Sequence, residues 1–510
     1  MIQLFSVYPS QISVYENLGI ARIKTFLEER GYHAVDTYIS LEFSSEEQLS
    51  LINKDMKYFG FSFQYTYADF IFAFSKEIKR LIPDSIIFLG GRAATDAYKI
   101  ILNECEYIDS IILGHGEFPL YEAIKQLESG VSLDDISKSS AYIATKNNIE
   151  NKTDCNTDIN LLSLPKRNFK ANNLIVATIC TSHGCVGKCT FCAWETKDTK
   201  WCGRSMKDVF DEIKRINIEF GIKIFNFTDA SFEDPGSLGK QRINELCDYI
   251  SEYGAPLAFR CFIRSETFKN NTDDINLLKK MRANGFTLFF VGIESMVDEE
   301  LKLFNKRATS ADNINILNLL KASDIDFYYG FIMMNPYSTL NTLKINYNFL
   351  KDNDCIHLRS YINVLAAFYK TQLYDILRKD NLLLEDYSYK NPFLYRNKYI
   401  ETEAIKQFMS EISNKSITTR YWEYYNSMNN IYGIKATHRN VYDDYINEIN
   451  KINETIANIL SEYFYNLYEK NDVLICRNTF DHFDKLLSNE YVQIGKVLLK
   501  VLKKSKYIRL

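Results

Sequence analysis

The sequence has almost no excess of charge of one sign, few cysteines for its length and no long apolar run, and each shortage excludes a class of protein. Its 510 residues carry 61 Lys and Arg against 65 Asp and Glu, a net charge of -4 that gives nucleic acid no basic surface. Eleven cysteines are too dilute for a disulfide scaffold, and Ile2 to Val7 resembles a strand rather than a signal peptide. No apolar run reaches the ~18 residues of a membrane helix. We therefore expect a cytoplasmic protein with reduced thiols, without a nucleic-acid partner or membrane span.

Over residues 1–140, short apolar runs alternate with amphipathic stretches, which predicts a doubly wound, Rossmann-like α/β domain. Leu18 to Arg30 has helical spacing of its apolar residues and is followed by Gly31, a common C-cap. The loops after the expected strands are rich in small and polar residues, and ligands of such sheets bind at the carboxyl ends of the strands. The expected strands are Ile2 to Val7, His33 to Tyr38, Tyr58 to Phe63, Ile86 to Gly90 and Ser110 to Leu113.

A polar stretch over residues 141–172 indicates a linker, and a second α/β region follows over residues 173–372. Within it, Met206 to Phe220 has helical spacing behind Ser205, a good N-cap. Repeated strand and helix units of this length predict a partial (β/α)6 parallel barrel, and residues 373–510 are mostly helical in pattern. The expected barrel strands are Leu174 to Ile179, Ile224 to Thr228, Leu257 to Ile263, Thr287 to Ile293, Asp326 to Met333 and Ser360 to Leu365.

The most specific motif is a run of three closely spaced cysteines, Cys185, Cys189 and Cys192. Three thiols on one tight loop predict a metal site. Zinc usually takes four protein ligands, often as two separated pairs, and no second pair is visible in the sequence. An iron-sulfur cube fits better, because three thiolates hold three irons and leave the fourth open to a ligand. Buried cysteines or a zinc knuckle are the alternative.

This Cys-x3-Cys-x2-Cys loop resembles the signature of the radical S-adenosylmethionine (radical SAM) superfamily, including the aromatic Phe191 before the last cysteine. The resemblance covers residues 174–383. It departs from the family at Asn335, where a glycine is usual, and before Thr371, where a glycine is missing. The other matching segments are Trp201 to Ser205, Phe227 to Phe232, Gly292 to Ser295, Gly330 to Pro336 and Thr371 to Tyr374.

The resemblance implies a [4Fe-4S] cluster on the three cysteines, which cleaves S-adenosylmethionine to a 5'-deoxyadenosyl radical inside the barrel. It also implies an electron donor such as a flavodoxin or ferredoxin, and a small-molecule or peptide substrate. The residues expected to contact S-adenosylmethionine are Phe191, Thr228, Asp229, Arg264, Glu294 and Ser295.

The N-terminal domain resembles the cobalamin-binding domain that one large radical SAM class carries. Family members that ligate cobalt from below use an Asp-x-His-x-x-Gly loop, whereas residues 9–17 contain no histidine. Cobalamin is therefore a possible third cofactor, without a histidine ligand from this loop. The residues expected to line its site are Ser62, Gly90, Gly91, Gly114, His115 and Glu117.

Three functions follow from these resemblances. The first is cobalamin-dependent radical methylation of an unactivated carbon, with S-adenosylmethionine used both as methyl source and as radical source. The second is cobalamin-independent hydrogen abstraction on a peptide, as in epimerisation or cross-linking, with Cys202, Cys261 or Cys355 as hydrogen donor. The third is a non-catalytic iron-sulfur or cobalamin sensor.

Overall fold

The computed structural model describes residues 1–9, 16–167, 176–193, 200–353 and 358–413, with scattered positions between 451 and 496. It divides into two compact units, each described here by itself. The N-terminal unit comprises Met1–Leu174, Ala193–Arg204 and Ser388–Pro392. The barrel unit comprises Ile175–Cys192, Ser205–Tyr387 and Phe393–Leu510.

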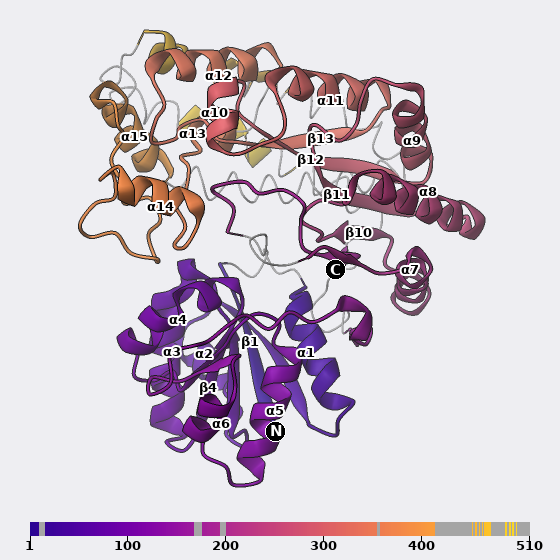
Figure 1. Cartoon of the computed structure of the whole chain (residues 1–510). Helices are drawn as coiled ribbons and strands as arrows, with labels where there is room; N and C mark the ends of the chain where they lie inside the picture. The colour runs from indigo at the N-terminus through magenta and orange to yellow at the C-terminus, as the bar shows by residue number, and fades with distance from the viewer. Residues whose placement is uncertain are drawn as a thin grey trace. The chain divides into compact units, whose positions relative to one another are not determined.

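The N-terminal unit is a six-stranded sheet with the strand order β2-β1-β3-β4-β5-β6 and helices on both sides (Figure 1). Its first five strands are parallel, and β6 runs antiparallel to β5. This is a doubly wound order with its switch point between β1 and β3, as predicted. The strands are β1 (Ile2–Tyr8), β2 (Ala34–Ser40), β3 (Tyr58–Ser62), β4 (Ile86–Gly90), β5 (Ser110–Ile112) and β6 (Ile143–Ala144).

Both faces of this sheet are buried, which explains why its strands have nearly continuous apolar sequences. On one face, Leu4 of β1 packs in a buried cluster with Leu27 of the first helix. On the other face, Phe5 stacks on Phe61 and meets Phe74 of the third helix edge-on. The helices are α1 (Leu18–Glu28), α2 (Ser45–Ser50), α3 (Ala68–Leu81), α4 (Arg92–Glu104), α5 (Glu117–Glu128) and α6 (Leu133–Ser139), with 3-10 turns η1 (Tyr65–Tyr67) and η2 (Ile159–Leu161).

The stretch 141–172, expected as a linker, instead contributes to the N-terminal unit. It supplies β6, and its Cys155 forms a parallel bridge with Gly114. Gly114 has a φ of 76°, and a Cβ there would lie 2.3 Å from the Cys155 carbonyl oxygen, so only glycine fits this crossing. The unit therefore extends beyond residue 140 because a two-residue strand is too short to give a sequence pattern.

The barrel unit is built on a five-stranded sheet with the order β13-β12-β11-β10-β7. All neighbouring strands are parallel, so each is followed by a helical crossover, as in a partial barrel. The strands are β7 (Val176–Ile179), β10 (Ile224–Phe227), β11 (Ala258–Arg264), β12 (Phe286–Glu294) and β13 (Asp326–Phe331), beside the two-residue β8 (Ser182–His183); β9 (Cys202–Gly203) belongs to the N-terminal unit.

The expected sixth barrel strand, Ser360 to Leu365, is helical in its first half. Its first residues belong to α13 (Leu358–Ile362), and only Val364 forms a parallel bridge, to Met334. The backbone N–H of Leu365 also donates to Met334. The prediction of a strand was therefore wrong for most of this segment, and one bridge marks its place.

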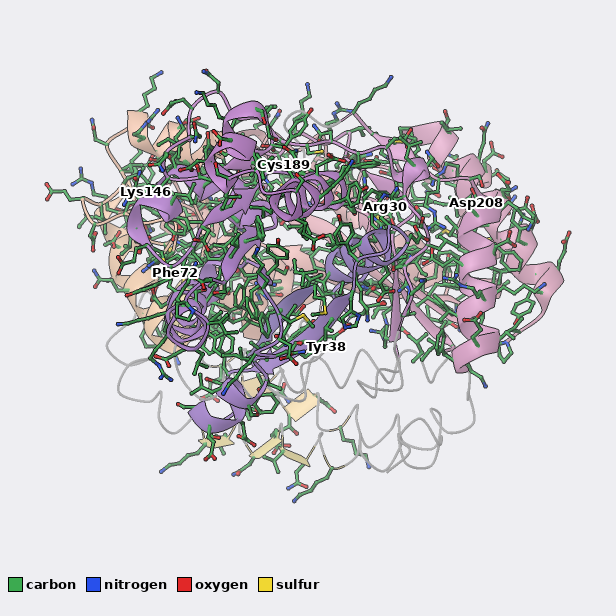
Figure 2. All side chains as sticks on the ribbon, turned by 90° about the horizontal axis from the view of Figure 1, so that it is seen from below. Arg30, Tyr38, Phe72, Lys146, Cys189 and Asp208 are labelled. Carbon is green, nitrogen blue, oxygen red and sulfur yellow. The ribbon has the colours of Figure 1, made fainter. Side chains whose placement is uncertain are left out.

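The helices of the barrel unit follow their sequence signals closely. Helix α7 (Met206–Phe220) has the predicted bounds, and the Ser205 side chain caps it by accepting from the N–H of Asp208, which Figure 2 labels. The helical C-terminal domain expected over residues 373–510 stays a prediction, because most of residues 414–510 lie outside the described ranges. The other helices are α8 (Gly236–Tyr253), α9 (Thr272–Ala283), α10 (Asp298–Leu303), α11 (Ser310–Ala322), α12 (Leu340–Asp352), α14 (Gln372–Lys379), α15 (Ile400–Ser413) and the π-helical turn η3 (Tyr465–Glu469).

Among the described residues, no helix has the length and hydropathy that crossing a membrane requires.

Candidate active site

The cysteine loop, residues 184–192, follows β7 and β8 at the carboxyl end of the parallel barrel sheet. Cys185, Cys189 and Cys192 are half-buried and unbonded to one another. The carboxylate of Asp229, just after β10, anchors the entrance to this loop: it accepts from the Thr181 N–H at 3.1 Å and from the Thr181 and Ser182 hydroxyls at 2.7 and 2.5 Å. Asp229 was predicted to contact S-adenosylmethionine. The structure gives its carboxylate a positioning role within the protein.

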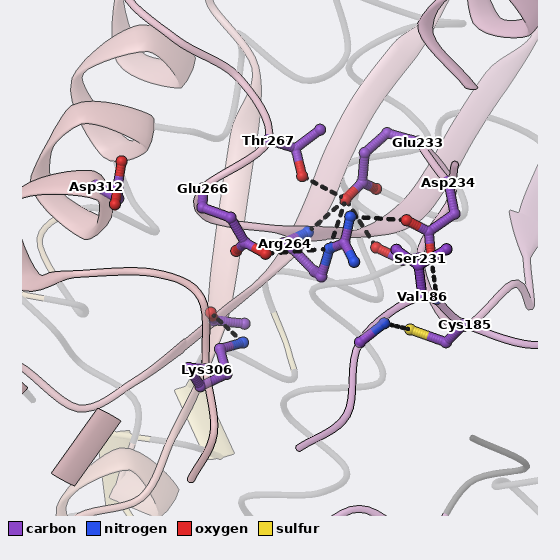
Figure 3. A network of polar contacts seen from close by, with 12 residues as sticks. Cys185, Val186, Ser231, Glu233, Asp234, Arg264, Glu266, Thr267, Lys306 and Asp312 are labelled. Atoms are coloured by element: carbon purple, nitrogen blue, oxygen red, sulfur yellow. Dashed lines mark hydrogen bonds and ion pairs between the residues drawn. The ribbon is translucent and has the colours of Figure 1, made fainter. Parts of the chain in front are cut away.

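Asp234 anchors the loop at its first cysteine (Figure 3). Its carboxylate accepts from the Val186 N–H at 3.0 Å and pairs with Arg264 at 2.7 Å. The segment that carries Asp234 is pressed against helix α8, where a Cβ on Gly239 would lie 2.0 Å from the Glu233 carbonyl oxygen. This close approach fixes both carboxylates beneath the loop.

Arg264, at the end of β11, gathers three carboxylates (Figure 3). Besides Asp234, its guanidinium lies 3.6 Å from Glu233 and 3.3 Å from Glu266. Burial raises the pKa of the Glu233 carboxyl, and Arg264 opposes that rise. The Arg264 Nη1 atom is buried without a hydrogen-bond partner and lies 4.0 Å from the position of a Cβ on Gly187, so one donor faces the cysteine loop.

Glu294 stands on a β-bulge at the end of β12. Its φ is 66°, which is strained for a residue other than glycine, and the register with β13 shifts between Gly292 and Glu294. Lys306 lies 3.7 Å from the Glu294 carboxylate and donates to the Gly292 carbonyl at 3.0 Å. A Cβ on Gly292 would lie 2.9 Å from the Lys306 Nζ, and one on Gly330 would lie 3.3 Å from Glu294, so two glycines form the floor beneath this ion pair.

Burial favours the protonated form of two thiols of the loop, Cys185 and Cys189. Burial raises the pKa of Cys185 to about 12, and the charge of Asp234 adds to the rise. Burial likewise raises the pKa of Cys189 to about 11, against the opposing charge of Lys306. Metal binding would have to displace these protons, as for any thiolate ligand.

The donor set suits an iron-sulfur cluster better than a single ion. Within the described ranges, no three His, Cys, Asp or Glu side chains lie close enough to hold one metal ion. A cluster asks for a different arrangement, because each thiolate binds its own iron. A Cβ on Gly187 would lie 3.3 Å from the Cys185 sulfur, so the loop keeps that side of the thiol clear. Arg264 and Lys306 bring two cations to this edge of the sheet, and both are already paired with carboxylates.

Two further residues predicted to contact S-adenosylmethionine have partners inside the protein. The Ser295 hydroxyl is fully buried and donates to Glu300 at 2.6 Å. The same carboxylate accepts from Asn335 at 2.8 Å, which gives a purpose to the residue that replaces the family's glycine. The Thr228 hydroxyl donates to the Ile179 carbonyl at 3.3 Å across neighbouring strands. Their contact with a cofactor stays a prediction.

The ring of Phe191 packs edge-on against that of Phe304, with the ring centroids 5.4 Å apart. There the Thr190 carbonyl accepts from the Leu373 N–H at 2.8 Å. The Thr371 hydroxyl caps α14, so the turn that lacks the family's glycine still delivers Leu373 to the cysteine loop.

The residues expected to line a cobalamin site lie at the carboxyl ends of the strands of the N-terminal unit. Gly90 ends β4, and a Cβ there would have no atom within 4 Å, which leaves open space. Gly91 has a φ of 99° and begins α4. The Nδ1 of His115 accepts from the Thr157 N–H at 2.8 Å, and Glu117 is buried at the start of α5, while Ser62 ends β3 half-buried. These residues fit a ligand-binding sheet edge, and their contact with cobalamin stays a prediction.

The three hydrogen-donor candidates have different surroundings. Cys202 belongs to the N-terminal unit, where its thiol donates to Asp158 at 3.1 Å. Cys261 is fully buried in β11, and burial raises its pKa well above the usual value. Cys355 lies outside the described residues.

The charged residues beneath the cysteine loop were not predicted from the sequence. They are Glu233, Asp234, Glu266 and Lys306, which come from three different connections of the barrel. The adjacent acids in Phe232-Glu-Asp-Pro235 were a usable signal, because two carboxylates directly after a strand pattern point to the carboxyl edge of the sheet. Lys306 had no comparable signal.

Comparison with known proteins gives the class. Residues 179–350 match the radical SAM superfamily model, which spans the cysteine loop and the sheet up to α12. The chain is therefore a radical SAM protein. Its N-terminal unit adds the α/β fold found in the class with a cobalamin-binding-like domain, as the structural comparisons bear out.

One relative and two solved structures are informative. An uncharacterised methyltransferase of Pyrococcus horikoshii is 24% identical over 361 residues, which are 69% of this chain and 74% of the relative. The chain spans 46% and 39% of the length of two further curated relatives, a cyclase and a synthase. The cobalamin-dependent S-adenosylmethionine radical enzyme OxsB, solved with aqua-cobalamin and S-adenosylmethionine, superimposes with a TM-score of 0.67 at 17% identity, covering 99% of this chain and 80% of that one. The radical S-adenosylmethionine methyltransferase TsrM of Kitasatospora setae gives 0.58 at 16% identity, covering 78% and 80%.

Proposed function

We propose that this protein is a cobalamin-dependent radical SAM methyltransferase that methylates an unactivated carbon of a small-molecule or peptide substrate. The observation that carries the proposal is the cysteine loop, which buried charges fix at the carboxyl end of a parallel sheet within a matched radical SAM domain. The likeness to a named methyltransferase and the fold shared with a cobalamin-dependent enzyme support methyl transfer as the outcome.

Cys185, Cys189 and Cys192 are the residues that would hold a [4Fe-4S] cluster. When bound, the cluster supplies the electron that cleaves S-adenosylmethionine to methionine and a 5'-deoxyadenosyl radical. The protein's part is to keep the three thiols on one rigid loop. Asp229 holds the entrance of that loop and Asp234 holds its first cysteine.

The charges around the loop favour a cationic ligand. Four carboxylates, Glu233, Asp234, Glu266 and Glu294, face two cations, Arg264 and Lys306. This local excess of negative charge suits the sulfonium of S-adenosylmethionine. The Nη1 of Arg264 is buried without a hydrogen-bond partner and could donate to a ligand carboxylate.

The N-terminal unit would hold cobalamin at the carboxyl edge of its sheet, near the switch point between β1 and β3. The open space over Gly90 and the left-handed backbone of Gly91 suit the close approach of a large flat ligand. Bound cobalamin supplies the methyl group. No histidine precedes Glu16 in the first loop, so the chain itself offers cobalt no imidazole there.

The overall reaction balances with an external reductant. Two S-adenosylmethionine cations, two electrons and one substrate C–H group give S-adenosylhomocysteine, methionine, 5'-deoxyadenosine and one new C–CH3 bond. The two electrons would come from a low-potential protein such as a flavodoxin or ferredoxin. A cluster with an open iron also requires a reducing compartment, which makes the cytoplasm its expected location.

The test is anaerobic reconstitution of the full chain with iron, sulfide, cobalamin, S-adenosylmethionine and a one-electron reductant, followed by mass spectrometry of the products. Formation of both 5'-deoxyadenosine and S-adenosylhomocysteine, with retained cobalamin, is expected. Formation of 5'-deoxyadenosine alone, with no retained cobalamin, would favour cobalamin-independent hydrogen abstraction over methyl transfer. If neither product forms, the non-catalytic sensor is the function that remains. A Cys189→Ala variant is the control for cluster-dependent cleavage.

A further inference from the structure

The turn Leu303–Lys306, here called the clasp, grips the cysteine loop on both sides of Cys189. The Thr190 N–H donates to the Phe304 carbonyl at 3.0 Å, and the Thr190 hydroxyl donates to the Leu303 carbonyl at 2.9 Å. On the other side of Cys189, the Asn305 side chain donates to the Lys188 carbonyl at 2.7 Å. Residues 188 and 190 are therefore both fixed by one short segment that follows α10.

The last residue of the clasp, Lys306, places its charged side chain in the site. The Lys306 side chain is only 5% exposed, although lysine is rarely buried without a purpose. Its Nζ donates to Gly292 and pairs with Glu294, whose bulged, left-handed backbone and glycine floor leave room for both side chains. Its charge acts on Cys189 and Glu266 as well. One cation therefore pairs with the bulge carboxylate, while its own backbone segment holds the residues on both sides of Cys189.

We infer that Lys306 is a positioning residue that couples Glu294 to the cluster ligand Cys189, and that its charge sets the reduction potential of the cluster. The inference rests on the proposed function, because it assumes that the three cysteines hold a cluster. The clasp fixes where Cys189 lies, and Lys306 fixes Glu294 from the same backbone segment.

The sign of the effect follows from charge. One-electron reduction adds a negative charge to a cluster that already carries three thiolates, and a buried cation nearby stabilises the reduced form. Removing that cation lowers the potential. Removing its carboxylate partner leaves the cation uncompensated and raises the potential.

The experiment is an EPR-monitored redox titration of the reconstituted full chain without S-adenosylmethionine, so that it reads the cluster rather than the reaction. We expect Lys306→Met to shift the ratio of oxidised to reduced cluster about tenfold toward the oxidised form, which is about 59 mV for one electron. Lys306→Arg keeps the charge and should restore most of the wild-type potential. Lys302→Met removes an exposed lysine of α10 and serves as the matched control, with no shift expected.

Two more variants separate charge from folding. Glu294→Gln should raise the potential, opposite in sign to Lys306→Met, which no general loosening of the site would do. Asn305→Gly removes the hydrogen bond to Lys188 but keeps a residue suited to the φ of 52° at this position, so it should broaden the EPR signal with a small shift. If the Lys306→Met protein incorporates no iron, the sign of the potential shift in Glu294→Gln tests the inference instead.

A Lys306→Met protein with full iron and the wild-type potential would overturn the inference, as would shifts of the same sign in Lys306→Met and Glu294→Gln. The failure of the proposed function looks different: wild-type protein would then assemble no cluster, or would hold one and cleave no S-adenosylmethionine. The two outcomes are therefore distinguishable.

Discussion

The two candidate binding regions are built in different ways. The cysteine loop of the barrel unit rests on buried charge, since Asp229, Asp234 and the clasp hold it while Arg264 and Lys306 balance the carboxylates around it. The sheet edge of the N-terminal unit rests on backbone shape, with Gly90 leaving open space at the end of β4. A site for electron transfer needs a fixed field, whereas a site for a large cofactor needs room. We therefore expect substitutions of single charged residues to disrupt the barrel site more than the N-terminal site.

The largest effect is expected from the cluster cysteines. Cys185→Ala should lose the cluster and reduce 5'-deoxyadenosine formation to background, because two remaining thiolates leave a second iron without a protein ligand. Iron content and the absorbance of the reconstituted protein measure the loss. Cys105→Ala, a buried thiol of the N-terminal unit, is the matched control and should keep both iron and cleavage. Equal iron in the two variants would contradict the assignment of the loop.

The second-largest effect is expected from a buried carboxylate of the barrel unit. Its substitution should cost more unfolding free energy than that of an exposed one. Asp234→Asn breaks a largely buried pair with Arg264 and should cost about 3 kcal/mol of unfolding free energy, since Glu233 and Glu266 still face the guanidinium. Asp248→Asn removes an ion pair with Lys280 of similar length, 2.6 Å, that is largely exposed, and should cost about 0–1 kcal/mol. Urea unfolding of the cluster-free proteins measures both values. Similar losses would show that burial is not what makes the Arg264 network matter.

A methyl group should distinguish the crowded Gly292 of the barrel unit from the open Gly90 of the N-terminal unit. Gly292→Ala puts its Cβ 2.9 Å from the Lys306 Nζ and 3.0 Å from Glu294, so the ion pair must move. We expect about tenfold weaker binding of S-adenosylmethionine, the effect of about 1.4 kcal/mol, by equilibrium dialysis. Gly90→Ala adds its methyl to open space and should leave that affinity unchanged. Equal affinities for both variants would mean that Glu294 does not contact the ligand.

The sequence was a good guide to what is local and a poor guide to what is brought together. The barrel strands β7 and β10 to β13 and helix α7 follow their apolar periodicity, and the spacing of three cysteines on one loop identifies them as a possible ligand set. Asp234 and Lys306 lie 49 and 121 residues after Cys185, and only the parallel crossovers carry them to the same edge of the sheet. β6 was missed because two residues carry no periodicity. Ser360 to Leu365 was overcalled as a strand because a short apolar run fits a helix equally well.

The smallest expected effect concerns a thiol that is not part of the cysteine loop. In the N-terminal unit, Cys202 donates to Asp158 at 3.1 Å, and burial and then this carboxylate raise the pKa of its thiol. The raised pKa keeps more of Cys202 in the protonated form above pH 8, the form a hydrogen-atom donor needs, and slows its alkylation because thiolate is the reactive species.

Asp158→Asn removes the charge and keeps an oxygen acceptor, so the pKa of Cys202 should fall toward its usual value. We expect the rate of iodoacetamide labelling at pH 8 to rise about two- to threefold, read from the Cys202 peptide by mass spectrometry. Cys261 serves as the internal control, because its thiol is fully buried and should stay unlabelled in both proteins. An unchanged or slower rate at Cys202 would mean that burial alone raises the pKa of this thiol. The comparison with the cysteines of the barrel, whose pKa values respond to nearby charges, would then not extend to Cys202.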